Sequence, residues 1–173
     1  MGESAVHDWP GIMAEILRGY VLPSDGAHGV VHWARVWENG HRLARVTGAD
    51  QEIVGLFALF HDARRVNEQR DDGHGERGAE LARAMRQTWL DLGDDQFDLL
   101  IEACRYHTDG LTAGHSTVLT CWDADRLDLG RVGIEPRAHR LCTEAGRDLL
   151  RWAHGRATRQ DVPTRVLRMW GIE

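Results

Sequence analysis

The sequence has no lysine, only three cysteines, and no apolar run near the ~18 residues that a membrane-spanning helix needs. All 21 basic residues are arginine, a bias for which the sequence offers no functional explanation. The opening residues, MGESAVHDWPG, lack the pattern of a secretory signal peptide. These absences argue against a membrane or exported protein, and we expect a soluble cytoplasmic protein without a membrane partner.

The three cysteines are Cys104, Cys121 and Cys142, and none of them belongs to a C-x-x-C pair. Each falls within an apolar pattern of helical spacing. Because free cysteine behaves as a small apolar side chain, we expect buried, reduced thiols rather than a disulfide scaffold.

The formal net charge is −6, which repels polyanions and disfavours a polymeric nucleic acid as partner. Hydrophobic content of 42% and charged content of 28% are ordinary for a globular protein. A chain of 173 residues is long enough to bury one sizeable core. The residue type that needs explaining is histidine, which occurs ten times.

Apolar residues recur at three- and four-residue steps along almost the whole chain, which predicts helices. The predicted helices cover residues 9–21, 29–47, 50–63 and 74–92, a fifth from GDDQ to about His107, and a sixth over STVLTCWDADRLDLGRVG. Two or three shorter helices follow, and no alternating strand pattern, internal repeat or linker is present. We therefore predict a single all-α domain of about seven to nine helices over residues 1–173, with residues 135–173 packed on a core of roughly residues 28–134.

An apolar run, LFALF, ends at His61 and Asp62 and passes into the polar stretch ARRVNEQRDDGHG. A carboxylate beside a buried helix is costly unless a cation or hydrogen-bond donors accompany it. His32, His74, His107 and an acid in DADRLD also lie at the end, or on the apolar face, of a predicted helix. A lone histidine in such a place is more often a core residue, but imidazole and carboxylate together are ligands of divalent metals. The set predicts a metal site.

The segment DADRLD offers three acids as the late ligand. Asp125 lies on the apolar stripe that runs through Trp122 and Leu129, whereas Asp123 lies ~160° away around the helix axis. Asp128 shares the Asp125 face one turn later and is the second candidate. Helix geometry favours Asp125.

The order His…His-Asp…Asp, present as HWARV, LFHDARR and DADRLD, resembles that of the HD-domain metal-dependent phosphohydrolases over roughly residues 28–134. The resemblance implies an all-helical core of the HD-domain type, with a metal held by His32, His61, Asp62 and Asp125. One branch of this family has two further histidines that serve a second metal, and His74 in GHGERGAELA and His107 in CRYHTDG match their places. Asp62 would then bridge two ions.

Arginines stand close to these residues in the sequence. Arg64 and Arg65 directly follow the His-Asp pair, and Arg35 comes one turn after His32. Guanidinium groups bind phosphate oxygens in a bidentate manner, so all three are candidate phosphate ligands. The alternative is that they are solvated charges or partners of nearby acids. Glu68 is a candidate for orienting a water molecule or a ligand histidine.

The remaining histidines have no evident role. They are expected as surface or loop residues, or lack a partner that the sequence identifies: His7, His28, His41, His115, His139 and His154.

The resemblance implies hydrolysis of a phosphate ester, in a nucleotide or similar small metabolite, by a water molecule activated on the metal. The expected catalytic residues are Asp62, Arg64, Arg65 and Glu68. One or two divalent ions are expected as cofactor, and the ligand types do not distinguish Mn, Fe, Mg, Zn, Co or Ni. A di-iron oxygenase of the HD-domain type and a non-catalytic metabolite-sensing module are the alternatives. The sequence does not indicate an oligomeric state.

Overall fold

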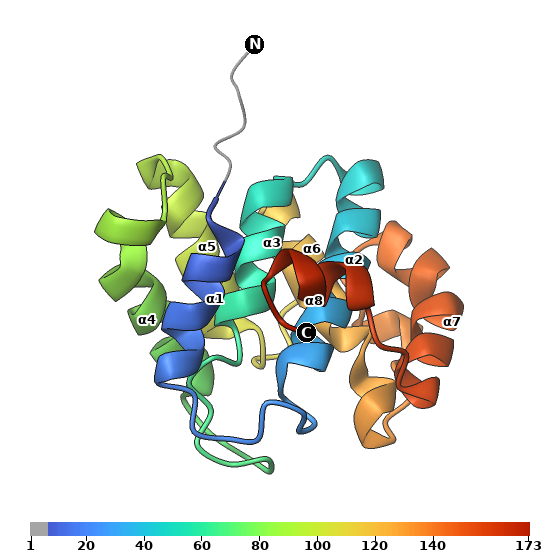
Figure 1. Ribbon diagram of the computed structural model, residues 1–173. Helices are drawn as coiled ribbons and strands as arrows, with labels where there is room; N and C mark the ends of the chain where they lie inside the picture. Colours follow the sequence, from blue (N-terminus) through green and yellow to red (C-terminus); the bar gives the residue numbers. More distant parts are fainter. Residues whose placement is uncertain (1–6) are drawn as a thin grey trace.

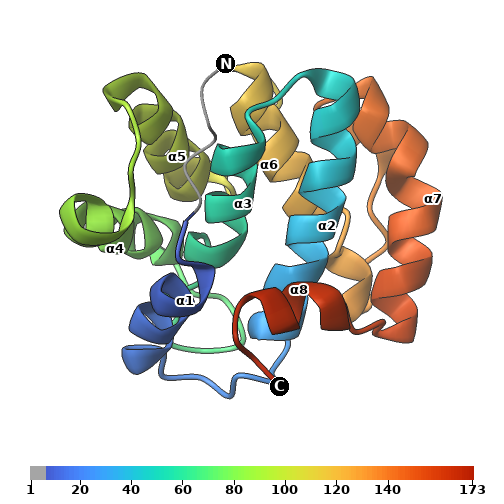
Figure 2. The same cartoon turned by 45° about the horizontal axis from the view of Figure 1, so that its top comes forward.

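Figures 1 and 2 show a computed structural model in which the chain forms a bundle of α-helices joined by short loops. The structure describes residues 7–173; the first six residues, part of the segment without a signal-peptide pattern, lie outside this range. The helices are α1 (Trp9–Arg18), α2 (Val30–Thr47), α3 (Gln51–Phe60), α4 (His74–Trp89), α5 (Asp94–Tyr106), α6 (Ser116–Arg126), α7 (Glu144–Arg159) and α8 (Thr164–Met169). Two short 3₁₀ helices, η1 (Leu129–Val132) and η2 (Ala138–Arg140), lie between α6 and α7.

No strand occurs among residues 7–173, so the predicted all-α fold is confirmed. None of the helices in this part of the chain is long and apolar enough to cross a membrane.

Helix ends follow local capping chemistry. Asp50 accepts hydrogen bonds from the backbone N–H groups of Glu52 and Ile53 and starts α3 where the sequence predicted. The predicted sixth helix is shorter than expected, because α6 ends at Arg126 and the chain continues as a separate 3₁₀ turn. That turn ends at Gly133, whose φ of 78° is readily adopted only by glycine.

The core is built around α3, which Figure 2 shows among α1, α2, α5 and α6. All eight residues from Ile53 to Phe60 are buried. Two glycines let neighbouring helices approach α3 closely. A Cβ atom on Gly40 of α2 would lie 2.3 Å from Val54 Cγ1, and one on Gly78 of α4 would lie 2.3 Å from the Phe60 carbonyl oxygen. The contact at Gly40 sets the distance between α2 and α3, and the contact at Gly78 sets the distance between α4 and the end of α3.

The carboxyl-terminal helices α7 and α8 both contact α2. Trp170 is buried, and its ring packs edge-on against Trp37 with the centroids 5.6 Å apart. Cys104 and Cys121 are buried free thiols, as predicted. Cys142 is different: it lies before α7, not in a helix, and is only half-buried.

Candidate metal centre

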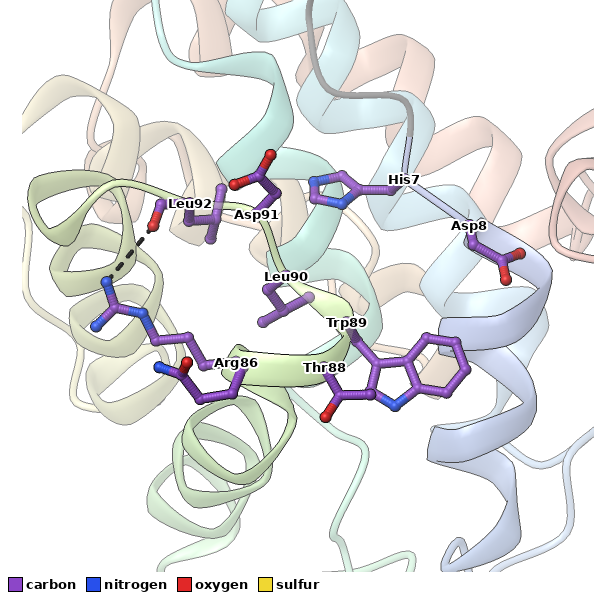
Figure 3. Close-up of a pocket in the computed structure, with 9 residues that line it drawn as sticks. His7, Asp8, Arg86, Thr88, Trp89, Leu90, Asp91 and Leu92 are labelled. Atoms are coloured by element: carbon purple, nitrogen blue, oxygen red, sulfur yellow. Dashed lines mark hydrogen bonds between the residues drawn. The ribbon is translucent and has the colours of Figure 1, made fainter.

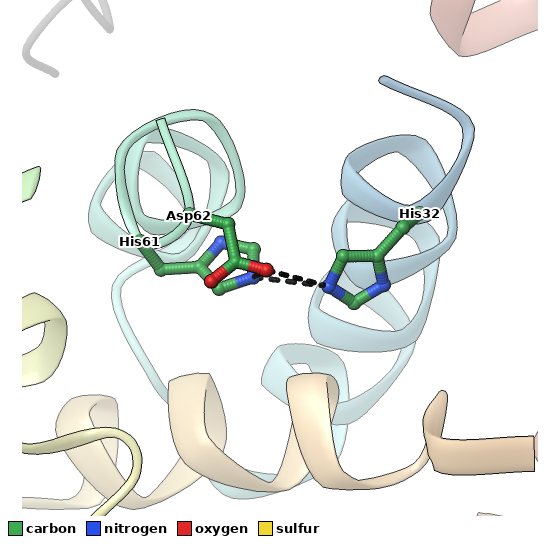
Figure 4. A group of neighbouring side chains, drawn as sticks. All are labelled: His32, His61 and Asp62. Atoms are coloured by element: carbon green, nitrogen blue, oxygen red, sulfur yellow. Dashed lines mark hydrogen bonds and ion pairs between the residues drawn. The ribbon is translucent and has the colours of Figure 1, made fainter. Parts of the chain in front are cut away.

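Six side chains meet at one end of the bundle, where five helices begin or end. We call them the candidate metal centre: His32 near the start of α2, His61 and Asp62 at the end of α3, His74 at the start of α4, His107 after α5, and Asp125 near the end of α6. They are the six residues that the sequence analysis named as candidate metal ligands. Figure 4 shows three of them, His32, His61 and Asp62, pointing toward one another from α2 and the end of α3.

Four of these residues surround what we call the first position. His32 Nε2 lies 3.1 Å from His61 Nε2 and 3.3 Å from Asp125 Oδ1. Asp62 Oδ2 lies 3.6 Å from His32 Nε2 and 3.7 Å from His61 Nε2. His32, His61 and Asp62 thus form a group that could hold an ion, and Asp125 Oδ1 lies beside the Nε2 atoms of both histidines.

The second position lies on the other side of the Asp62 carboxylate. Asp62 Oδ1 lies 3.1 Å from His74 Nε2 and 3.7 Å from His107 Nε2. The two histidine nitrogens are 2.9 Å apart. Asp62 thus turns one oxygen to each position, which is the arrangement of a bridging carboxylate.

Hydrogen bonds at Nδ1 fix the direction of all four imidazole rings. His61 Nδ1 donates to the carbonyl oxygens of Phe57 and Ala58, both at 3.1 Å. His74 Nδ1 donates to the Asp71 carbonyl at 2.6 Å, His107 Nδ1 to the Cys104 carbonyl at 2.7 Å, and His32 Nδ1 to Asp128 Oδ2 at 2.7 Å. Because these oxygens only accept, the neutral ring carries its hydrogen on Nδ1 and directs the Nε2 lone pair into the centre.

This donor set fits a metal ion. Two Nε2 lone pairs that face each other at about 3 Å repel unless a cation or proton lies between them. Ligands at ~2.0–2.1 Å from a common ion are about 3.0–3.4 Å apart, close to the separations seen here. The groups His32, His61, Asp62 and Asp62, His74, His107 each bring ligand atoms within 4.8 Å of one another and could each hold an ion.

The electrostatics of the centre favour charged carboxylates at Asp62 and Asp125 and a neutral imidazole at His61. Burial acts to raise the pKa of Asp62, but the surrounding histidines outweigh it and hold this pKa well below its usual range. Burial also acts to raise the pKa of Asp125, but the interactions with His32, His61 and His107 outweigh it and lower this pKa. Burial lowers the pKa of His61 to about 3, so this ring is neutral near pH 7. His107 differs, because the nearby Asp62 carboxylate outweighs burial and raises its pKa.

Asp128, the second candidate for the late ligand, orients a ligand instead. Its Oδ2 accepts from His32 Nδ1, and its Oδ1 accepts from Arg35 Nε at 2.7 Å. Arg35 also donates to the Asp161 carbonyl at 3.0 Å and is buried. Arg35 is thus the partner of a nearby acid, which is the alternative that the sequence left open. Asp123 lies away from the centre, as predicted, and accepts from Cys142 N and Thr143 N ahead of α7.

The two arginines after the His-Asp pair point in different directions. Arg64 was expected at the phosphate, but its guanidinium donates to the carbonyls of Ile16 and Ala63 and so packs against α1. Arg65 turns inward and is buried, with Nη1 3.2 Å from His74 Nε2 and 3.7 Å from Asp62 Oδ1. Of the two, only Arg65 adjoins the candidate metal centre.

His28 is the residue near the centre that the sequence did not reveal. It was expected in a loop, yet it is buried, and its Nδ1 lies 2.5 Å from Glu68 Oε2. The loop is held at this point because the His28 carbonyl accepts from Tyr20 Oη and Trp33 Nε1. The His28 ring centroid lies 6.4 Å from that of His32. In the sequence, only its position four residues before His32 indicated that His28 lies near the centre. Glu68 therefore orients a histidine, but not one of the six candidate ligands.

Other histidines lie outside the centre. His7 is buried and pairs with Glu52 Oε1 at 2.6 Å, a partner that the sequence did not indicate. His41 stacks on the Trp37 ring with centroids 4.3 Å apart. His115 caps α6 by accepting from Thr117 N.

A helical bundle in which helix ends bring four histidines and two aspartates together has the architecture of a helical metal-site protein. The HD domain family model matches residues 29–153, which is most of the chain, and the chain belongs to this family. It is similar to the crystal structure of a predicted HD superfamily hydrolase from an uncultured Thermotogales bacterium. The TM-score is 0.64 at 25% sequence identity, over 95% of this chain and 92% of that one. None of the curated proteins matches the chain.

Proposed function

We propose that the protein is a metal-dependent phosphohydrolase that cleaves a phosphate ester of a nucleotide or similar small metabolite. Membership of the HD domain family and the likeness to a predicted HD superfamily hydrolase support a hydrolase in general. The observation that carries the proposal is the pair of adjoining ligand groups that share Asp62, one oxygen to each. Phosphoryl transfer is the chemistry that two adjoining cations suit best, because they can stabilise both the attacking and the leaving oxygen.

A divalent ion in such a site lowers the pKa of its bound water from ~15.7 toward ~7 and thereby supplies hydroxide near neutral pH. Asp62, His32, His61 and Asp125 would hold one ion, and Asp62, His74 and His107 a second. The Nδ1 hydrogen bonds keep all four rings in place without a rearrangement on binding.

Arg65 would bind a phosphate oxygen beside the second position. Its Nε and Nη2 atoms donate to the carbonyls of Asn67 and Gln69, at 3.3 Å and 2.5 Å, so the guanidinium is held on the protein side. Nη1 is the atom nearest Asp62 and His74. A fixed cation there offsets the charge that phosphate oxygens gain as the ester bond breaks.

His28 would supply the proton that the leaving oxygen needs. Its Nδ1 faces Glu68, which leaves Nε2 as the atom able to donate. Glu68 stabilises the protonated ring, while burial lowers the pKa of His28 and eases loss of the proton. Glu68 would then orient His28, whereas the sequence analysis expected it to orient a water molecule or a ligand histidine.

Two measurements test the proposal. The first is elemental analysis of the purified protein. The second is phosphate release from a panel of nucleotides and sugar phosphates, with Mn²⁺, Mg²⁺, Zn²⁺, Co²⁺, Ni²⁺ or Fe²⁺ added in turn. We expect metal-dependent release that Asp62→Asn abolishes and that Asp94→Asn, at an exposed ion pair with Arg86, leaves unchanged.

Absence of turnover over the whole panel would contradict the proposal. Oxygen consumption by the iron-loaded protein would instead favour the oxygenase alternative, which the same two-position ligand set could serve. A protein that binds the phosphates without turning them over would favour the sensing module.

A further inference from the structure

The side chains of the candidate metal centre differ in their exposure to solvent. The ligand side chains of His32, His61, Asp62, His74 and His107 are between 0% and 6% exposed. Asp125 is 16% exposed. Asp125, at the end of α6, is therefore the candidate ligand that a molecule from solvent can reach most directly.

A cavity of about 310 Å³ lies in the segments next to Asp125. Gly110, three residues after His107, forms one part of its wall, and Arg126, directly after Asp125, forms another. Leu129 and Ile134 from the η1 region line it as well. The volume is within the range of small-molecule sites. Arg126 directly follows Asp125 and Gly110 follows His107 by three residues, so the cavity is built from the segments that carry two of the candidate ligands.

A larger cavity, of about 720 Å³, does not share this relationship. Figure 3 shows its lining residues, among them His7, Asp8 and the segment 86–92, which contains the last turn of α4 and the residues that follow it. His7 pairs with Glu52 at the start of α3, whereas His61 follows the end of that helix. The ten residues of α3 separate the two by roughly 15 Å. This cavity is too far from the centre to hold the rest of a substrate whose phosphate is bound there.

The wall of the smaller cavity combines apolar side chains with arginines that are not used in the fold. Leu129, Ile134 and Leu141 line it, and Ile134 is exposed. Arg137 and Arg140 also line it and are exposed, and within residues 7–173 neither guanidinium forms an ion pair or a side-chain hydrogen bond. Arg126 is different, because it donates to the carbonyls of Leu111 and Arg140 and so holds the wall together.

The wall of this cavity carries more basic than acidic side chains. Three arginines face one acid, Glu135, in a protein whose formal net charge is −6. Two unpaired guanidinium groups beside an apolar surface match a ligand with an apolar body and a negative group of its own.

We propose that this cavity binds the leaving-group part of the substrate, and that this part carries a second anionic group bound by Arg137 and Arg140. The inference rests on the proposed function and narrows its substrate class to phosphate esters with a distal phosphate or carboxylate, such as nucleoside bisphosphates. The apolar wall of Leu129 and Ile134 receives the ring system between the two anions.

The test compares adenosine 3′,5′-bisphosphate with adenosine 5′-monophosphate in the wild type and in the double variant Arg137→Gln/Arg140→Gln. The double variant is expected to raise KM for the bisphosphate about tenfold relative to KM for the monophosphate, the size of one lost charge-assisted hydrogen bond. Arg165→Gln, in a separate arginine-rich groove beside Trp37 and Met169, is the matched control and is expected to change neither KM. An unchanged ratio of the two KM values in the double variant would overturn the inference.

A binding measurement keeps the inference separate from the proposed function. Calorimetric titration of adenosine 3′,5′-bisphosphate into metal-free protein needs no turnover. A Kd about tenfold weaker in the double variant supports the inference even if neither nucleotide is hydrolysed, in which case only the proposed phosphohydrolase activity fails. Equal Kd values, or no binding to the wild type at millimolar concentration, count against the inference whether or not phosphate is released.

Discussion

His32 donates its Nδ1 hydrogen to Asp128 Oδ2 across 2.7 Å, and both side chains are buried. The bond joins α2 to the segment after α6 and leaves His32 Nε2 directed at the candidate metal centre. Arg35 holds the second oxygen of the same carboxylate. Asp128 contacts the centre through His32. It thereby controls the direction and the basicity of this one candidate ligand.

Asp128→Asn tests this relationship. An amide oxygen accepts a weaker hydrogen bond than a carboxylate, so metal affinity at the first position is expected to fall about 10–100-fold. The second position, which lacks His32, is expected to keep its affinity. Calorimetric titration with Zn²⁺ or Mn²⁺ separates the two sites, and Asp94→Asn serves as control. An equal loss at both positions would show that Asp128 acts on the fold rather than on His32.

His28 is expected to act on the leaving group. His28→Gln and Glu68→Gln should each lower kcat by about 10²-fold for an alkyl phosphate, whose alkoxide must be protonated as it leaves. The loss should be much smaller for 4-nitrophenyl phosphate, because nitrophenolate leaves without a proton. His41→Gln, in a half-buried ring that lies outside the centre, is the control. Equal losses for both substrates would mean that His28 only supports the structure.

Gly78 is expected to be needed for the second position. A Cβ at this residue would lie 2.3 Å from the Phe60 carbonyl and 3.2 Å from that of His61, and backbone on both sides leaves no flexible side chain to move. Gly78→Ala should push α4 away from α3 at a net cost of about 1–2 kcal/mol, after the better helix propensity of alanine is counted. Affinity at the second position should fall with it, since His74 begins α4.

Gly155→Ala is the matched comparison for Gly78→Ala. The nearest atom to its added Cβ is the end of the Arg159 side chain, at 3.2 Å, which can move. This change in α7 is expected to raise the free energy of unfolding by up to about 1 kcal/mol. Thermal or urea unfolding measures both variants, and a Gly78→Ala protein as stable as the Gly155→Ala protein would refute the proposed packing.

The two positions should release metal at different pH values. Metal and proton compete for the same Nε2 lone pair. Asp62 raises the pKa of His107, so this ring takes up a proton first as the pH falls, and the second position should lose its ion first. Burial lowers the pKa of His61 to about 3, so protons do not compete with a metal ion for this ring between about pH 8 and pH 5. Metal content after dialysis at steps from about pH 8 to pH 5 checks the order, and simultaneous release would contradict it.

Many residues of the centre could be predicted from the sequence because they occupy regular positions in the helical pattern of apolar residues. His61 and Asp62 end an apolar run, and Asp125 shares a helix face with Trp122, so their placement depends on contacts a few residues away. The capping of α3 by Asp50 is equally local. The sequence could therefore place each candidate ligand at the end or on the apolar face of a helix, and the all-α fold follows from the same repeating pattern; packing between the five helices brings these residues together.

The arginines and His28 depend on segments far apart in the chain, and no local pattern describes them. Arg64 and Arg65 are adjacent and identical residues, but their side chains have different partners. Arg64 donates to the carbonyl of Ile16, 48 residues earlier, whereas Arg65 contacts His74. Arg35 finds Asp128 across 93 residues, and His28 finds Glu68 across 40. A long, flexible side chain at a helix end takes the direction in which the folded chain offers a partner. The sequence therefore indicated which side chains can hold a metal ion. Packing between distant segments determined that Arg65, and not Arg64 or Arg35, lies beside them, and that His28 is buried near them.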